Sequence, residues 1–487
     1  MYHAAREKKR PAGVYPGGPQ AAFYGDDYVY YQPAIEAIKP GPIQKASTIM
    51  RPIPIVDISN AGGKRVIRRI RKSQQARAGR AQAVVATVLA DVGRRGDAAL
   101  FAYTRKFDHV AVFAGNIRLD AAYIRDRAHD APAAFRRSCA EAAKRIRAYH
   151  ERQKPCEFVM RTREGLLSQI VRPVRRAGVY VPGGFALYPS SVLMNVIPAQ
   201  IAGVREIAVA TPPRGELDPG IAFALRMLGV SEVYRMGGAQ AIAALAYGTR
   251  SVEAVDKIVG PGNLYVALAK KAVFGTVDID AVAGPSEVIV LADGSANPEW
   301  VALDLLAQAE HGSGDETAFC VTEDARFAAR VQSAVAAEIA RSPVRPVFER
   351  LRAGALCICL ASSRGKSIEF VNECAPEHLE IVTRNPRRDL AGIRNAGAVF
   401  IGPYSPVAVG DYFAGTNHVL PTGGAARFAS GLGVESFVKR MSVAEISKEG
   451  LGRASAHVSV LARAEKFVHH ALSVERRTGR QPAGDPA

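Results

Sequence analysis

Gly178-Val-Tyr-Val-Pro182-Gly-Gly184 opens the stretch that decides the fold, because a short β-branched run there ends in a glycine turn. The alternation continues as helix 190–201, strand 206–211, helix 221–228, strand 232–236 and, after two glycines, helix 239–247. Strands, glycine turns and helices in this order are typical of a doubly wound parallel sheet. The stretch therefore predicts one α/β unit.

A second series of the same kind follows further along the chain. Its expected elements are strand 287–292, helix 300–310, strand 317–321, helix 325–340 and strands 355–360 and 398–401. Residues 74–150 have helical periodicity. We therefore predict an α/β protein with two Rossmann-like parallel-sheet domains and small helical N- and C-terminal segments. In such sheets ligands bind beyond the carboxyl ends of the strands.

Length and cysteine usage restrict the class of protein. A chain of 487 residues is too long for one ordinary core, which favours two domains with appendages. No apolar stretch has the length of a membrane span, and the N-terminus lacks a secretory signal pattern. Cys357 and Cys359 alternate in an apolar strand and are expected to be buried thiols, and no CxxC pair occurs. We expect a reducing, cytoplasmic location without membrane association.

The net charge of +18 is partly concentrated in the basic run 64–80. Such a run could contact nucleic acid, but no aromatic stacking platform or zinc finger accompanies it. A solvated basic helix face is the better interpretation. Residues 1–45 are rich in Pro, Gly and Tyr, which predicts a disordered extension.

Two short segments place metal-ligating or proton-transfer groups at favourable spacing. Gln308 and His311 are three residues apart in an expected helix, so they share a face and offer an amide oxygen and an imidazole to a metal. Pro376 fixes the backbone before Glu377 and His378, so that a turn there can present an acid beside an imidazole. Taken alone, each segment is also compatible with an ordinary helix face or a surface turn.

Three loops supply further candidates. A glycine-rich loop joins Asp411, a carboxylate able to ligate a metal, to His418. Two Gly/Pro turns end at Asn263 and Ser286, where a ligand could approach the backbone and accept or donate hydrogen bonds. No GxGxxG fingerprint occurs, so these residues by themselves leave the cofactor open.

Eight motifs follow one another along the chain. They are YVPGG (180–184), GGAQAIAALAYGT (237–249), KIVGPGN (257–263), AGPSEV (283–288), LLAQAEH (305–311), APEHLE (375–380), GDYFAGTNHVLPTGG (410–424) and KRMSVAEISKEGL (439–451). In this order they resemble the histidinol dehydrogenase family, over about residues 53–477. Because chance similarity at eight ordered motifs is negligible, the chain is identified as a member of that family.

The resemblance implies one zinc ion per subunit. The implied metal ligands are Gln308, His311, Asp411 and His470. The last is placed by an Ala-Glu pair followed five residues later by a histidine. Lys466 and Phe467 depart from the family pattern in this region, so His469 and His457 stay open as alternatives for the fourth ligand.

The resemblance also implies the roles of the other site residues. Glu377 and His378 would be catalytic, with His378 removing the hydroxyl proton and Glu377 activating a water. The implied substrate-binding residues are Ser286, Gln308, His311, His378, Asp411, His418, Glu465 and His470. NAD+ would be held by Tyr180, Gln240 and Asn263.

The implied activity is the four-electron oxidation of L-histidinol to L-histidine, through bound histidinaldehyde and with two NAD+, at the end of histidine biosynthesis. The family is an intertwined homodimer, in which the C-terminal His and Glu complete the partner's site.

One alternative function is that of a related zinc and NAD enzyme for another amino or sulfonated alcohol. A non-catalytic basic binding protein is the other. The histidinol enzyme is favoured over the related enzyme, because its substrate-side residues are matched by Ser286, Glu465 and 188–191.

We expect a discontinuous domain organisation. The expected parts are the extension 1–45, a small segment 46–73, a first α/β domain of 74–186 and 288–409, a second, NAD-binding α/β domain of 187–287 and 410–430, and a C-terminal helical segment 431–487 that reaches the partner subunit.

Overall fold

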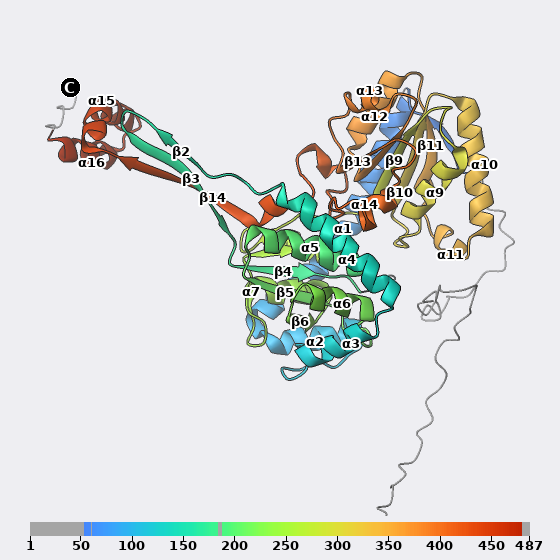
Figure 1. The fold of residues 1–487 in the computed structure, drawn as a ribbon, viewed down its shortest axis with the longest axis horizontal. Helices are drawn as coiled ribbons and strands as arrows, with labels where there is room; N and C mark the ends of the chain where they lie inside the picture. The colour runs from blue at the N-terminus through green and yellow to red at the C-terminus, as the bar shows by residue number, and fades with distance from the viewer. Residues whose placement is uncertain (1–52, 60, 184–187, 480–487) are drawn as a thin grey trace, which may run out of the picture. The chain divides into compact units, whose positions relative to one another are not determined.

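The computed structural model describes residues 53–59, 61–183 and 188–479 (Figure 1). The expected extension 1–45 lies outside the described residues, as do most side chains of the basic run 64–80. Two parallel sheets and one antiparallel ribbon make up the described strands. No helix among the described residues is long and apolar enough to cross a membrane.

The larger sheet has six parallel strands in the order β1-β11-β10-β9-β12-β13. Its strands are β1 (Ile55–Asp57), β9 (Glu287–Ala292), β10 (Thr317–Thr322), β11 (Leu356–Leu360), β12 (His378–Val382) and β13 (Ala398–Ile401). The helices of this part are α9 (Pro298–Ala309), α10 (Ala325–Arg341), α11 (Arg345–Phe348), α12 (Arg364–Cys374), α13 (Pro386–Leu390) and α14 (Val407–Tyr412). Every residue of β9, β10 and β12 is buried. A parallel strand covered on both faces has no polar side, which explains their nearly continuous apolar sequences.

The smaller sheet has five parallel strands in the order β6-β5-β4-β7-β8. They are β4 (Arg176–Tyr180), β5 (Glu206–Thr211), β6 (Glu232–Arg235), β7 (Lys257–Val259) and β8 (Asp278–Ile279). Their connecting helices are α5 (Pro189–Ala202), α6 (Pro219–Met227), α7 (Gly238–Tyr247) and α8 (Leu264–Val273). Four earlier helices complete this part: α1 (Ala61–Arg95), α2 (Asp97–Asp108), α3 (Ala121–His129) and α4 (Ala133–Glu151).

Side-chain alternation gives the smaller sheet two cores. Ala177 and Val179 of β4 belong to a buried cluster with α4, α5 and α6. Ala208 and Ala210 of β5 belong to a second cluster with α1, α7 and α8. Successive residues of a strand point to opposite faces, so both faces of this sheet are covered by helices. The predicted parallel α/β architecture is confirmed.

Both sheets repeat one topology. In the smaller sheet, β4 is followed by β5 and β6 on one side, and the chain then crosses to place β7 and β8 on the other. In the larger sheet, β9 is followed by β10 and β11, and then β12 and β13 lie on the opposite side. Each sheet therefore has a topological switch point, β4/β7 in one and β9/β12 in the other, where doubly wound sheets bind ligands.

A three-stranded antiparallel ribbon was not predicted. It has the order β14-β3-β2, with β2 (Phe158–Arg161), β3 (Gly165–Pro173) and β14 (Val438–Ile446). Helices α15 (Lys448–Ala464) and α16 (Val468–Thr478) follow β14 and lie at the tip of the ribbon (Figure 1). Ile446 pairs with Gly165, whereas Val438 pairs with Pro173 beside β4. Nine ribbon residues at about 3.3 Å each separate this tip from β4.

The expected domain boundaries need two corrections. Strand β4, within 74–186, belongs to the smaller sheet, and α1 packs on α7 and α8 of the same part. Residues 74–186 therefore accompany 187–287 rather than 288–409, because β4 is the central strand on which that sheet is built. The segment 431–487 begins with nine residues of strand in β14, so it is not helical throughout.

Buried thiols follow the expected strand alternation. Cys357 and Cys359 are both buried on β11, and their Sγ atoms lie 3.8 Å apart. The six cysteines of the chain lie among the described residues, and none of them forms a disulfide.

We predict that Arg176 is a major contributor to the stability of the smaller sheet. Its guanidinium is 2% exposed and donates to Glu206 and Glu232 at the amino ends of β5 and β6. Arg176→Met should lower the free energy of unfolding by about 3 kcal/mol, because the Glu232 carboxylate, which is 18% exposed, loses its cationic partner. Arg175→Met is the matched control, since Arg175 is 53% exposed and also contacts Glu206; it should cost less than about 1 kcal/mol. Equal losses in urea unfolding would contradict the assignment.

Candidate active site

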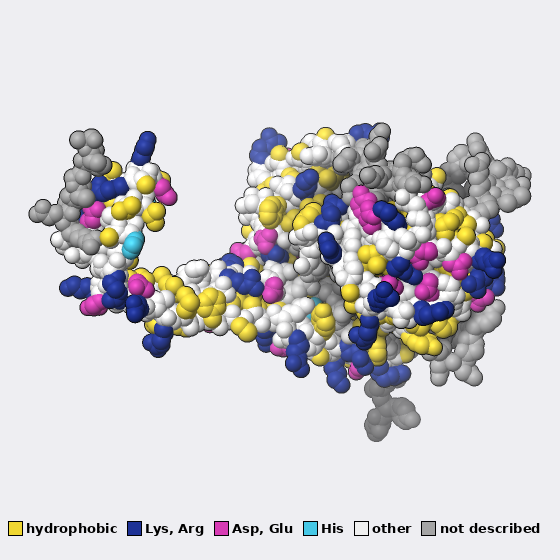
Figure 2. Space-filling model, turned by 90° about the horizontal axis from the view of Figure 1, so that it is seen from above, with side chains coloured by type: hydrophobic (Ala, Val, Ile, Leu, Met, Phe, Trp, Pro, Cys, Tyr) yellow, Lys and Arg dark blue, Asp and Glu magenta, His cyan; other side chains and the backbone are white. Residues whose placement is uncertain are grey.

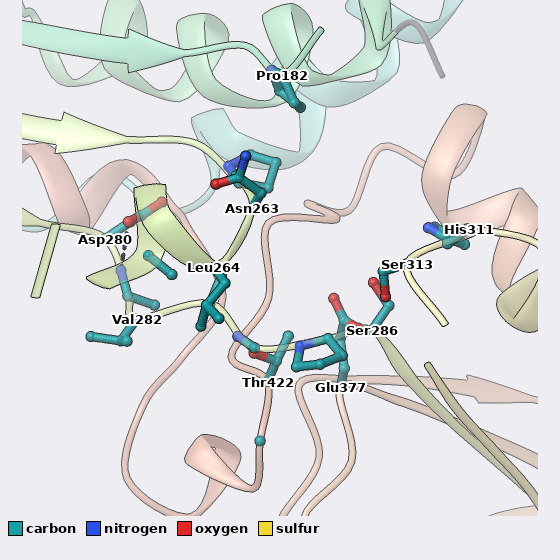
Figure 3. A pocket seen from close by; sticks show the side chains of 18 of the residues that line it. Pro182, Asn263, Leu264, Asp280, Val282, Ser286, His311, Ser313, Glu377 and Thr422 are labelled. Carbon is teal, nitrogen blue, oxygen red and sulfur yellow. Dashed lines mark hydrogen bonds between the residues drawn. The ribbon is translucent and has the colours of Figure 1, made fainter. Parts of the chain in front are cut away.

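One cleft lies where the switch points of the two sheets come together. Its volume is about 1220 Å³, more than the roughly 300–1,000 Å³ of a site for one small molecule. Tyr180, the last residue of β4, lines it from the carboxyl end of that strand. Asn263 lines it from beyond β7, and Ser286 and Glu377 line it from before β9 and β12 (Figure 3). The cleft therefore has room for two ligands between the sheets.

The two sheets contribute opposite ends of their strands. The smaller sheet presents carboxyl ends, as expected for a doubly wound sheet. The larger sheet presents amino ends instead: Ser286 precedes β9, Ser313 and Glu316 precede β10, Arg352 precedes β11, and Glu377 precedes β12. The cleft thus lies at the carboxyl ends of the smaller sheet, as expected for a ligand site, but at the amino ends of the larger sheet. Sequence reading missed 313–316 and Arg352, although the glycine- and serine-rich run after His311 gave a turn signal.

Glu377 and His378 are held by the backbone of one residue, Glu287, at the start of β9. The Glu287 N–H donates to Glu377 Oε2 at 2.9 Å. His378 Nδ1 lies 3.1 Å from the Glu287 carbonyl oxygen, and because that oxygen only accepts, Nδ1 carries the proton. His378 Nε2 then keeps its lone pair, and it has no hydrogen-bond partner within the described structure. The imidazole is oriented as a free base.

Burial controls the protonation of this pair. The side chains of Glu377 and His378 are 9% and 6% exposed. Burial, with a smaller effect of nearby His311 and His418, lowers the pKa of His378 to about 3, so the ring is neutral at neutral pH. Burial, aided by the carboxylates of Glu287 and Asp411, raises the pKa of Glu377 well above its ordinary value. A carboxyl group with a raised pKa is a stronger base once ionised, which suits the activation of water.

Two of the candidate metal ligands, His311 and Asp411, line the cleft beside this pair, whereas Gln308 is not among the residues that line it. Gln308 is buried in the last turn of α9, His311 lines the cleft directly after α9, and Asp411 lines it from α14. Gln308 Nε2 has no hydrogen-bond partner among the described residues; an amide flip would present oxygen there instead. Burial raises the pKa of Asp411 to about 7. A buried carboxylate of this kind, an imidazole and an unpaired amide fit a cation such as zinc.

The candidate C-terminal ligands lie elsewhere in the same chain. Glu465 and His470 are exposed residues in and before α16, at the tip of the ribbon, and neither lines the cleft. The His470 ring packs near Phe467, with centroids 5.1 Å apart. Within the described ranges, no group of three His, Cys, Asp or Glu side chains is arranged to hold a metal ion. One chain therefore supplies the cleft with only part of the expected metal-ligand set.

His418 lines the cleft from the glycine-rich loop that sequence reading selected. Burial, with a contribution from His311, lowers its pKa to about 4, so this ring is also neutral. The preceding residue anchors the loop: Asn417 is buried and donates to the Met194 carbonyl at 2.7 Å while accepting from the Val419 N–H. The loop thus presents His418 from a fixed backbone.

The candidate dinucleotide residues separate into two groups. Tyr180 and Asn263 line the cleft. Gln240 does not line the cleft. It lies in the first turn of α7, is 1% exposed, and its Nε2 donates to Asp108 Oδ2 at 3.2 Å. Four cationic side chains that sequence reading missed also line the cleft, namely Arg214, Lys271, Arg352 and Arg427. Five carboxyl groups line the cleft as well, and Arg352 is paired with one of them, Asp315. Arg214 and Lys271 come from the part of the chain that forms the smaller sheet, where they favour an anionic ligand.

Known proteins match this chain over nearly all of its described length. The model of the histidinol dehydrogenase family matches residues 71–478. Histidinol dehydrogenase of Rhodospirillum rubrum is 46% identical over 402 residues, which cover 82% of this chain and 92% of that protein. Histidinol dehydrogenase of Bacillus subtilis is 46% identical over 402 residues, with coverages of 81% and 93%. The crystal structure of histidinol dehydrogenase from Elizabethkingia anophelis has a TM-score of 0.77 and 36% identity, covering 82% of this chain and 92% of that chain.

The fold and the cleft define an α/β enzyme whose site combines an oriented acid–imidazole pair with cationic side chains. The match to the family model extends over most of the chain, and the relatives are similar along almost their whole length. The chain belongs to the histidinol dehydrogenase family, and the resemblance expected from its eight motifs is confirmed.

We predict that His378 reduces stability in acid. The ordinary pKa of 6.5 applies to the unfolded chain, whereas the folded value is about 3. The unfolded state therefore binds a proton first, and stability present above pH 6.5 is lost as the pH falls toward 3. His378→Asn should remove a slope of up to about 1.4 kcal/mol per pH unit from the unfolding free energy in that window. The unfolding free energies of both proteins are measured by urea unfolding from pH 7 to 4. The same dependence on pH in the two proteins would contradict this prediction.

Proposed function

We propose that this protein is a histidinol dehydrogenase that oxidises L-histidinol to L-histidine with two NAD+. The observation that carries the proposal is the Glu377–His378 pair in the cleft, held from both sides by the Glu287 backbone. The two groups have distinct protonation behaviour, as two successive oxidations require. The confirmed family membership supports the same reaction.

His378 would act first. Its Nε2 lone pair accepts the hydroxyl proton of histidinol while a hydride passes from the carbinol carbon to NAD+, giving histidinaldehyde and NADH. A pKa of about 3 in the free protein keeps this nitrogen available at neutral pH. The Nδ1–H bond to the Glu287 carbonyl stabilises the charge that develops on the ring.

Glu377 would act in the second oxidation. Its carboxylate removes a proton from water as the oxygen adds to the aldehyde carbon, and a second hydride then leaves the hydrated aldehyde for another NAD+. The products are histidine, a second NADH and released protons. Ser286 donates a hydrogen bond to Glu377 and lines the same wall, so it would orient the carboxylate and contact the substrate. Holding the aldehyde in one cleft protects it from side reactions.

Gln308, His311 and Asp411 would hold one zinc ion, together with His470 of the partner subunit. The metal would orient the amino and imidazole nitrogens of histidinol and polarise its oxygen. The three same-chain groups suit this role because one is an imidazole, one an unpaired buried amide and one a carboxylate without a cationic neighbour. Glu465 of the partner subunit and His418 would contact the substrate. His469 and His457 remain the alternatives to His470.

NAD+ would occupy the side of the cleft formed by the smaller sheet. Tyr180 and Asn263 line it, and Arg214 and Lys271 from the same part of the chain favour pyrophosphate. Gln240 would act only indirectly, because it is buried against Asp108. We further propose that the protein works in the cytoplasm, in keeping with its free cysteines.

A homodimer would complete the site, because the ribbon exposes an apolar surface suited to a second copy. Figure 2 shows hydrophobic side chains along the ribbon. The exposed apolar residues of the ribbon and its helices include Phe158, Val159, Met160, Met441, Val443, Val460, Leu461 and Phe467. Val159 is 69% exposed and Val460 68% exposed. Contiguous exposed apolar surface of this kind marks a protein interface. Exchange of ribbons between two chains would bring Glu465 and His470 to the partner's cleft.

We predict that the purified protein reduces two NAD+ per L-histidinol. The count follows from four-electron oxidation and is measured by NADH absorbance with limiting substrate. His311→Ala should lose the bound zinc, as measured by elemental analysis, together with activity. A protein that leaves histidinol untouched but oxidises another amino or sulfonated alcohol would replace this proposal with the related-enzyme alternative.

We predict that Glu377→Gln separates the two steps. The side-chain amide that this variant carries cannot take the proton from water, so oxidation of added histidinaldehyde should slow by about 10²–10⁴-fold. Single-turnover oxidation of histidinol to the aldehyde should change by less than about tenfold, since His378 is intact. His378→Asn is the comparison variant and should impair the alcohol step. Equal damage to both steps by Glu377→Gln would rule out its role as water activator.

We predict that two inactive variants restore each other if sites are shared between subunits. Co-expression of His470→Ala with His378→Asn gives heterodimers that have one intact site, so a random mixture should recover about a quarter of wild-type activity. Co-expression of His470→Ala with Glu465→Ala is the control. Both changes then lie on the contributed tail, so no intact site forms and no recovery is expected. Absence of recovery in the first mixture would show that His470 does not act in the partner's site.

A further inference from the structure

A buried ion pair lies at the dinucleotide side of the cleft. Lys270 of α8 and Asp280, which follows β8, have side chains only 2% and 5% exposed, and they are paired through Lys270 Nζ and Asp280 Oδ1. Neither residue belongs to the groups assigned above to proton transfer or metal binding. Asp280 also lines the cleft, beside Asn263 and Leu264 (Figure 3).

Both partners of this pair bind the backbone of Gly260. Lys270 Nζ donates to the Gly260 carbonyl oxygen at 2.9 Å. The Gly260 N–H donates to Asp280 Oδ2 at 2.8 Å. Gly260 has a φ of +106°, and a Cβ atom at this position would lie 2.1 Å from the Tyr180 carbonyl oxygen. The glycine is therefore packed tightly against β4 and held on both backbone groups by one ion pair.

The same pair joins the two loops that form this side of the cleft. Gly260 begins the loop to Asn263, whose Oδ1 caps α8 by accepting from the N–H groups of Tyr265 and Val266. The other Asp280 oxygen, Oδ1, accepts from the Ala281 N–H at 2.6 Å, at the start of the segment that leads to Ser286. The loop 260–263 is thus fixed at its first residue by the ion pair and at its last by the helix cap.

We propose that Lys270 and Asp280 are positioning residues for the dinucleotide. Their ion pair holds Gly260 so that the 260–263 loop and the 281–286 segment stand at a fixed separation, with the Asn263 amide nitrogen free for a ligand because its oxygen is engaged in the cap. The proposal rests on the proposed function, in that NAD+ is the ligand of this side of the cleft. A buried ion pair with several backbone hydrogen bonds is costly to desolvate, and fixing a particular loop conformation is a recognised reason for retaining one.

A neighbouring ion pair provides a matched control. Lys257 Nζ contacts Asp278 Oδ2 at 2.5 Å, and the Lys257 side chain is 6% exposed. This pair also links β7 to β8, but at the ends of the strands away from the cleft, and neither residue lines the cleft. Lys257→Met therefore removes a buried lysine from the same sheet without touching Gly260.

The test uses the full-length protein and measures NAD+ binding by calorimetry. Lys270→Met should weaken NAD+ binding by about 10- to 100-fold, since hydrogen bonds from a charged group to the loop are lost. The KM for NAD+ should rise in parallel, while kcat at saturating NAD+ changes by less than about threefold, because His378 and Glu377 keep their places. Lys257→Met should leave the NAD+ affinity within about twofold of wild type.

Two further variants separate positioning from charge and from folding. Asp280→Asn keeps the size of the side chain, so it provides the comparison should Lys270→Met fail to fold. The double variant Lys270→Met/Asp280→Asn leaves no uncompensated buried charge. If the pair positions the loop, the double variant should remain weak for NAD+; recovery of wild-type affinity in the double variant would overturn the proposal. A folded Lys270→Met protein with unchanged NAD+ affinity would overturn it as well.

Hydrogen exchange provides a readout that does not depend on NAD+. In the ligand-free protein, amides of the 260–263 loop should exchange faster in Lys270→Met than in wild type or Lys257→Met. Equal exchange in all three proteins would sink the positioning role. If the wild-type protein fails to bind NAD+ while the loop still exchanges faster in Lys270→Met, the proposed function is wrong and the role of the pair in fixing the loop stands.

Discussion

The parallel pairing of β9 with β12 is the constraint on which the site depends. Their register places His378, the first residue of β12, opposite Val288, which brings the first residue of β9, Glu287, beside both His378 and the preceding Glu377. One peptide group then donates to the acid and another accepts from the imidazole. A shift of this register by one residue would move both side chains to the wrong faces. The chemistry is therefore fixed by backbone pairing rather than by a network of side chains.

The two sheets use the same device at their switch points. Glu287 has both backbone groups engaged by the side chains of Glu377 and His378, and Gly260 has both engaged by Asp280 and Lys270. In the first case the backbone orients the two side chains proposed to be catalytic. In the second, the side chains form an ion pair and orient the backbone. The cleft thus receives fixed side chains from the amino ends of one sheet and a fixed loop from the carboxyl ends of the other.

Much of the fold could be predicted from sequence because buried parallel strands and their helices have strong local signals. The expected strand 287–292 and helix 325–340 match β9 and α10 to within one residue. The ribbon had no such signal, since β2 is exposed along its length and β3 pairs with a strand far along the chain. For the site, the motifs selected groups that do share one cleft, such as Ser286 and His418. Periodicity could not show that Gln240 is turned away from it.

The register of the ribbon has a consequence for biosynthesis. Arg440 pairs with Val171, about 270 residues earlier, and at roughly 5–20 residues per second the ribosome needs about 15–50 s to make that interval. The last strand of either parallel sheet ends at Ile401, so both sheets are complete before β14 emerges. During that time the edge of β3 that later receives β14 is open, beside the apolar residues of β2. The nascent chain therefore carries an unpaired strand edge on an otherwise foldable body, and this edge is a template for pairing with another chain until β14 has been made.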